Sequence, residues 1–114
     1  MEITITSVSD APAIKLNGRL DLKGTQEVEA EFNKNASESG KSVIVDLSEV
    51  NYIASIGIRM FLSNIKKMSP MGTKMVIFRP QKMVEEIFKL AGVDSIIPIE
   101  HDEDAAAEIV RNAS

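Results

Sequence analysis

The stretch between Val43 and Ile65 constrains the fold more than any other part of the chain. It begins with the β-branched apolar run Val43-Ile44-Val45, which predicts a buried strand over residues 42–47. Polar residues from Asp46 to Asn51 predict a loop after this strand. A helix is predicted over residues 56–68, because apolar residues recur at helical spacing, namely Ile58, Phe61, Leu62 and Ile65. A strand, a polar loop and an amphipathic helix in this order form one unit of an α/β fold.

Ser55 is the last residue before the predicted helix, where a side-chain oxygen can accept a hydrogen bond from a free backbone N–H group. The helix dipole and the free N–H groups also favour an anion at this place. Two interpretations follow for Ser55. Either it is a plain helix cap, or its hydroxyl accepts a phosphate beside a surface loop.

The rest of the chain alternates between strands and helices after an opening pair of strands. Alternating apolar and polar residues predict strands over 2–6 and 13–17, joined antiparallel by a turn at 9–12 and ended by Gly18. Further strands are predicted over 42–47, 74–79 and 96–99, and helices over 22–39, 56–68, 80–91 and from 102 onward. Helices between strands require parallel pairing with right-handed crossovers. The chain is therefore predicted to be one α/β domain over residues 1–114, with a mixed sheet.

Composition excludes several classes of function. The formal net charge of −4 leaves no basic surplus for a nucleic-acid backbone as the main partner. The chain has no cysteine, so a disulfide framework and thiolate metal sites are excluded. Its one histidine, His101, lies among charged residues and is interpreted as solvated, so no metal or other cofactor is expected. No signal-like segment and no apolar run of about 18 residues are present, so we expect a soluble, cytoplasmic protein without a membrane partner.

Known catalytic motifs are missing around Ser55. A nucleophile elbow, G-x-S-x-G, needs a glycine two residues before the serine, where this chain has Ile53. Neither of the glycine-rich phosphate loops, G-x-G-x-x-G and G-x-x-x-x-G-K-[ST], is present. The domain is therefore predicted not to be an enzyme.

The segment around Ser55 resembles the corresponding segment of the STAS domains, specifically of the bacterial anti-sigma factor antagonists. The signature of that family is a strand ending D-L-S, a short loop, and D-S-[ST]-[GA] opening a helix, with the first serine phosphorylated. Here the strand ends Asp46-Leu47-Ser48 and the motif reads Ala54-Ser55-Ile56-Gly57, so Ala54 and Ile56 depart from the pattern. A second landmark, L-x-G-x-L-D, is present as residues 16–21. The resemblance implies a mixed sheet with about four helices mostly on one face.

The resemblance also implies a regulatory binding module in a partner-switching circuit that controls transcription. In such a circuit the unphosphorylated module binds a serine kinase that is also the anti-sigma factor. Phosphorylation at Ser55 would release the module, and a separate serine phosphatase would reset it. The residues expected to contact the partner are Asp21, Asp46, Ala54, Ile56, Gly57 and Arg59.

Other interpretations remain open. A STAS-type sensor would bind a small ligand or a nucleotide near the Ser55 loop, and a scaffold subunit would use the fold only for contacts. Asp21 and Asp46 could satisfy loop N–H groups, and Gly57 could allow tight packing of its helix on the sheet. Three methionines could form a flexible apolar surface patch near this helix, namely Met60, Met68 and Met71.

Overall fold

The computed structural model describes residues 1–112 and consists of strands and helices in alternation after an opening hairpin. Its strands are β1 (Glu2–Val8), β2 (Ala11–Leu20), β3 (Val43–Ile53), β4 (Met75–Phe78) and β5 (Ile99–Glu100). Its helices are α1 (Leu22–Asn35), α2 (Ser55–Met68), α3 (Lys82–Leu90) and α4 (Glu103–Arg111), with short 3-10 helices η1 (Ser69–Met71) and η2 (Val93–Ser95). Among the residues described, no helix is long and apolar enough to span a bilayer.

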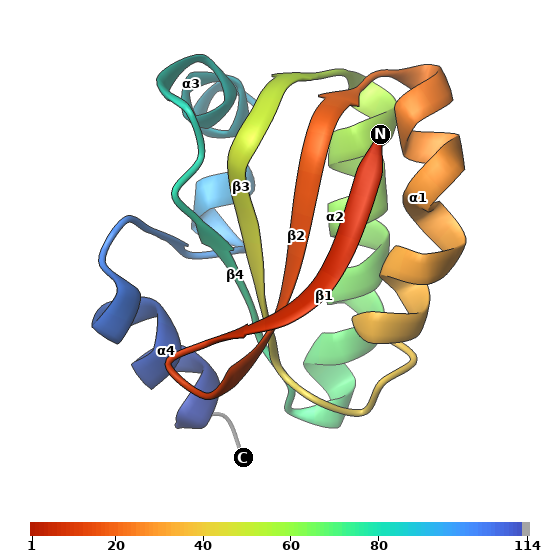
Figure 1. The fold of residues 1–114 in the computed structure, drawn as a ribbon. Coiled ribbons are helices and arrows are strands. Elements are labelled where there is room, and N and C mark those ends of the chain that lie inside the picture. Colours follow the sequence, from red (N-terminus) through yellow and green to blue (C-terminus); the bar gives the residue numbers. More distant parts are fainter. Residues whose placement is uncertain (113–114) are drawn as a thin grey trace.

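The five strands form one sheet in the order β1-β2-β3-β4-β5. β1 pairs antiparallel with β2, and every later neighbour pairs parallel. Helices α1, α2 and α3 pack against one face of the sheet, and α4 packs against the other (Figure 1). The prediction of a mixed α/β sheet with helices mostly on one face is confirmed.

The larger core fills the space between the sheet and the three helices on its first face. A row of phenylalanines links these helices: Phe32 of α1 meets Phe61 of α2 at 5.3 Å between ring centroids, and Phe61 meets Phe88 of α3 at 5.7 Å. Both pairs are edge-to-face, an arrangement that the ring quadrupole favours. The smaller core under α4 uses mostly alanine and β-branched residues, which let this helix lie close to the sheet: Ala11, Ala13, Ile44, Val76, Phe78, Ala106, Ala107 and Val110.

The opening hairpin turns through Ser9 and Asp10, whose φ angles are 48° and 66°. Two consecutive positive φ angles match the turn whose twist suits a two-residue hairpin. β2 then runs through Pro12 and Gly18 to Leu20, so the predicted strand over 13–17 is too short. Its pairing with β1 ends at Asn17, so the prediction that Gly18 ends the hairpin is confirmed. Pro12 is tolerated because pairing with β3 begins only at Ala13, and Gly18 takes a φ of +124° that other residues rarely adopt.

The loop predicted after residue 47 is part of β3, which continues to Ile53. Two register shifts against β2 explain the error, one between the pairs Lys15–Asp46 and Asn17–Glu49 and one after Gly18–Val50. At each shift β3 carries one extra residue, so the spacing of its core residues changes from two to three. Alternation is lost from there on, and a sequence pattern of period two no longer detects the strand. The residues of β3 that face the larger core are Val43, Val45, Leu47, Val50 and Ile53.

The buried face of α2 differs from the predicted stripe. Ile58 and Leu62 lie half-buried at its flank, whereas Met60 and Met68 are buried in the core. The predicted methionine patch on this helix is therefore wrong, and Met71, beyond its end, is the exposed one of the three. The face actually buried follows helical spacing: Gly57, Met60, Phe61, Asn64, Ile65 and Met68.

One polar side chain, Asn64, is 2% exposed within this face. Its Oδ1 accepts a hydrogen bond from the backbone N–H of Ser37 at 3.2 Å. Its Nδ2 donates to Asn33 Oδ1 and to the carbonyl of Met60, both at 2.8 Å. Asn64 thus joins α2 to the segment that follows α1, which ends at Asn35 instead of the predicted residue 39.

Candidate functional site

Helices α1 and α2 begin side by side because the strands that precede them end in register. Leu20, the last residue of β2, pairs with Ile53, the last residue of β3. The backbone N–H of Ala54 donates to the carbonyl of Leu20 at 2.9 Å. The first residues of the two helices therefore share one end of the domain, and α1 and α2 both start at the top of Figure 1.

Ser55 is exposed and is the first residue of α2. The capping position belongs to Ala54, whose carbonyl accepts hydrogen bonds from Gly57 at 3.0 Å and Ile58 at 3.2 Å. No side-chain oxygen caps this helix, so the interpretation of Ser55 as the capping acceptor is wrong. The hydroxyl is consequently not engaged in holding the helix start, and the free N–H groups of the first turn keep their capacity for an anion.

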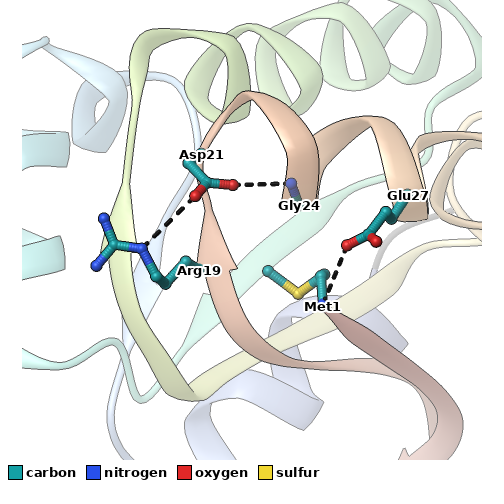
Figure 2. Close-up of polar contacts among 5 residues, drawn as sticks. All are labelled: Met1, Arg19, Asp21, Gly24 and Glu27. Carbon is teal, nitrogen blue, oxygen red and sulfur yellow. Dashed lines mark hydrogen bonds and ion pairs between the residues drawn. The ribbon is translucent and has the colours of Figure 1, made fainter.

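Asp21 caps α1, as Figure 2 shows. Its Oδ1 accepts a hydrogen bond from Gly24 N–H at 2.8 Å, and its Oδ2 lies 3.6 Å from Arg19 Nε. The Gly24 N–H, followed by Arg19, holds the pKa of the Asp21 carboxyl below its ordinary value of 3.8. The structure thus supports the structural alternative for Asp21, although the side chain stays partly accessible beside Ser55.

Gly24 was missed by sequence reasoning and is required by this capping arrangement. A Cβ built on Gly24 would lie 1.9 Å from the carbonyl oxygen of Arg19, well inside contact distance. The first turn of α1 therefore lies directly against the end of β2. A signal was available, because a glycine in the first turn of a helix lowers helix propensity and asks for a packing reason.

Gly57 has a similar role in α2. It is buried, and a Cβ there would lie 3.1 Å from the carbonyl oxygen of Leu20 and 3.0 Å from Ile53 Cγ1. Distances of that size are tighter than nine in ten real Cβ contacts, so a neighbouring group would have to move. The structure therefore supports the packing alternative for Gly57: its missing side chain brings α2 close to the ends of β2 and β3.

The remaining predicted residues fall into two groups. Ile56 is half-buried and Arg59 is exposed on the turn of α2 that follows Ser55, so both lie with Ala54 at the same end of the domain. Asp46 does not join them, because it sits within β3 and accepts a hydrogen bond from Ser48 N–H at 2.9 Å. At a strand rise of about 3.3 Å per residue, it lies roughly 20 Å from the strand end. Leu22, which sequence reasoning did not select, is 59% exposed at the start of α1.

His101 is not simply solvated. Its Nε2 lies 2.6 Å from Oε1 of Glu85, whose Oε2 lies 3.2 Å from Lys89 Nζ. The hydrogen bond from His101, and then that from Lys89, lowers the pKa of Glu85 below its ordinary value of 4.5. This cluster joins the loop after β5 to α3. Within residues 1–112, no group of three or more histidine or acidic side chains has the arrangement of a metal site.

Known proteins similar to this chain in sequence and in structure have the same fold. The STAS domain family model matches residues 2–106. BtrV of Bordetella bronchiseptica, which is named an anti-sigma factor antagonist, is 26% identical over 113 residues, covering 99% of this chain and 97% of BtrV. That alignment includes Ser55 and the helix that it begins.

Solved structures show the same fold at lower identity. An anti-sigma factor antagonist from Mycobacterium paratuberculosis superposes with a TM-score of 0.84 at 17% identity, covering 97% of this chain and 94% of that one. Unphosphorylated SpoIIAA gives a TM-score of 0.75 at 16% identity, with 95% and 96% coverage. The phosphorylated form of the Bacillus cell fate determinant SpoIIAA gives 0.68 at 16% identity, with 95% and 99% coverage. With a family model that spans residues 2–106, this chain belongs to the STAS domain family.

Proposed function

We propose that this domain is an anti-sigma factor antagonist whose binding to its partner is switched off by phosphorylation of Ser55. The observation that carries the proposal is the exposed Ser55 hydroxyl at the first residue of α2, a helix whose cap needs no side chain. Support comes from the names of similar proteins, since BtrV is named an anti-sigma factor antagonist and SpoIIAA has been solved with and without phosphate.

The physical basis of the switch is a charge that the domain tolerates and the complex does not. A phosphate adds about −1.5 to −2 charges at neutral pH, together with strong acceptor oxygens. At Ser55 the helix dipole and the first-turn N–H groups favour that charge, and Ala54, the residue before it, carries no carboxylate. The nearby carboxylate of Asp21 is already engaged with the Gly24 N–H and Arg19. A partner docked over the same residues would have to accommodate the buried phosphate. Binding is lost while the fold is kept.

The partner in this proposal is a serine kinase that is also the anti-sigma factor, and a separate phosphatase removes the phosphate. The domain acts as a ligand and a substrate in the cytoplasm, not as a catalyst. We assign the contact surface to Ser55 with Ala54, Ile56 and Arg59, and to Asp21 at the adjacent helix start. Gly57 and Asp46 act within the domain, through packing and through the bulge of β3.

The decisive experiment measures binding and stability separately in a matched set of variants. Ser55→Glu should weaken binding to the purified anti-sigma kinase by more than about tenfold in titration calorimetry, with an unchanged melting temperature. Ser55→Ala should bind normally and take up no phosphate. Ser63→Glu is the matched control, because Ser63 is also exposed on α2 but lies about two turns further along. Equal weakening by both glutamates, or a phosphate mapped to Ser48 or Ser63, would overturn the assignment.

A second pair of variants tests the docking surface. Arg59→Glu should weaken the complex and reduce its association rate, since the charge lies beside Ser55. Arg111→Glu should not, because this exposed arginine ends α4 and borders a groove with Asp10 and Lys41 at the opposite end of the sheet. The reverse pattern would place the partner on the other end of the domain. Normal binding by Ser55→Glu, with heat released on nucleotide addition, would instead favour the ligand sensor.

A further inference from the structure

The two edges of the sheet differ in how they are protected. β1 is an edge strand of seven residues that pairs with β2 without a bulge. It contains no lysine, arginine or proline, and five of its seven residues are exposed. In Figure 1 it lies in front of the other strands, and no other element crosses in front of it. Its outer backbone N–H and C=O groups are therefore available to another strand.

The opposite edge carries the usual protections. β5 has only two residues and is preceded by Pro98, whose ring removes a backbone donor. The 3-10 helix η2 lies just before it and α4 follows it directly. Natural sheets guard their edges with short strands, prolines and charges, because an open edge pairs with other chains. In this chain the short β5 and its preceding proline protect one edge of the sheet, whereas the edge formed by β1 has no such protection.

We propose that β1 is an interface for a second copy of this chain, paired antiparallel about a two-fold axis at Ile5. In this register Ile5 faces Ile5 of the other copy, Thr4 faces Thr6, and Ile3 faces Ser7. Two β1 strands would join the two sheets into one, with α1 of each copy on the same side. The arrangement is closed, because each copy uses its β1 edge once.

The side chains of β1 suit this pairing. Ile5 lies opposite Ile14 of β2, a residue of the larger core, yet Ile5 is 48% exposed. The pairing covers this side chain with its own counterpart. Thr4 and Thr6 lie on the other face, where threonine pairs across strands stabilise a sheet. The one charged residue of the strand, Glu2, would face Val8, and the two Glu2 side chains would be roughly 20 Å apart.

The size of the interface predicts a weak dimer. A single strand pair lies at the lower end of specific interfaces, which bury about 1,200 Å² or more when stable. Dimerisation should therefore depend on concentration in the micromolar to millimolar range. β2 separates β1 from β3, and Ser55 follows β3, so the pairing leaves Ser55 accessible in both copies.

Sedimentation equilibrium from about 10 µM to about 1 mM tests the proposal directly. The wild-type chain should move from monomer to dimer over this range. Ile5→Lys places two like charges on the two-fold axis and should weaken the dimer by at least about tenfold. Ile96→Lys is the matched control, because Ile96 is 57% exposed and lies near the β5 edge; it should leave the dimer unchanged. Circular dichroism checks that both variants remain folded.

Hydrogen exchange supplies a readout that needs no variant. The amides of Ile3, Ile5 and Ser7, which point away from β2, should exchange more slowly at high concentration than at low concentration, while the amides of β5 should not change. A wild-type chain that stays monomeric at about 1 mM overturns the proposal. So does a dimer that Ile5→Lys leaves intact, or one that Ile96→Lys breaks.

Discussion

Asn64 is the residue whose replacement tests the packing of α1 against α2 most directly. It is 2% exposed and is the acceptor for the backbone N–H of Ser37, in a buried bond of 3.2 Å. Asn64→Ala removes that acceptor while leaving the surrounding apolar side chains unchanged. The N–H of Ser37 then stays buried without a partner.

The magnitude follows from two opposing effects. A buried donor without a partner costs about 1–3 kcal/mol. Alanine has a higher helix propensity than asparagine, which returns up to about 0.7 kcal/mol. The free energy of unfolding should therefore fall by about 0.3–2.3 kcal/mol, which corresponds to about 1–10 °C in melting temperature for a domain of this size.

Asn64→Asp should lower the free energy of unfolding more than Asn64→Ala does, by about 3 kcal/mol or more relative to wild type. A carboxylate can still accept from Ser37, and Asn33 can rotate its amide to donate to it. The carbonyl of Met60, 2.8 Å from Nδ2 in the wild type, can only accept, so it would lie against a carboxylate oxygen with no hydrogen between them and would repel the charge.

Urea unfolding of the two variants provides the measurement, with Asn35→Ala as the control. Asn35 is only half-buried and donates to the carbonyl of Glu31 at the end of α1, so its loss should change stability by less than about 0.5 kcal/mol. The reasoning fails if Asn64→Ala is as stable as wild type. It fails equally if Asn64→Asp costs no more than Asn64→Ala.

Two further predictions concern the start of α1. Gly24→Ala should lower the free energy of unfolding, measured in urea, by about 2–3 kcal/mol. The alanine Cβ would lie 1.9 Å from the Arg19 carbonyl oxygen and would displace the first turn of α1. A variant as stable as the wild type would contradict this contact. Asp21 has a lowered pKa in the folded state, so the stability it contributes is present above about pH 3.8 and is lost as pH falls through the folded-state pKa. Asp21→Asn keeps an oxygen for the Gly24 N–H without the charge, so its melting temperature should fall less than that of wild type on acidification; parallel melting curves would contradict the ion pair and cap.

Local patterns predicted most of the elements of this fold. The alternation in residues 2–6, the short turn and the strand–helix units that follow were sufficient to predict an antiparallel hairpin and then parallel strands. Val28 and Phe32, four residues apart on α1, are both buried, as helical spacing requires. Asp102 starts α4 as expected, with Oδ2 accepting from Ala105 N–H at 2.9 Å. These features depend on residues close together in the sequence, so sequence patterns can predict them.

The site was predicted less completely than the elements around it. The position of Ser55 at the start of α2 could be predicted, because the helical pattern begins there. The role of Ala54 as the cap could not, since it depends on the bond from Ala54 N–H to the Leu20 carbonyl on another strand. Gly24 and Gly57 likewise have a reason only once the ends of β2 and β3 lie against them.

The sequence by itself determined the STAS fold, the order of its elements and the serine at the start of α2, through periodicity and a short motif. Only the tertiary structure decided what stands beside that serine. If the Lys15–Asp46 register continued without bulges, Leu20 would lie beside Asn51; the two extra residues of β3 bring it beside Ile53 instead. That shift aligns the starts of α1 and α2. It arises from hydrogen bonding between strands about thirty residues apart. A net slip of two residues returns side chains to the same face, so a side-chain period of two cannot distinguish the two registers.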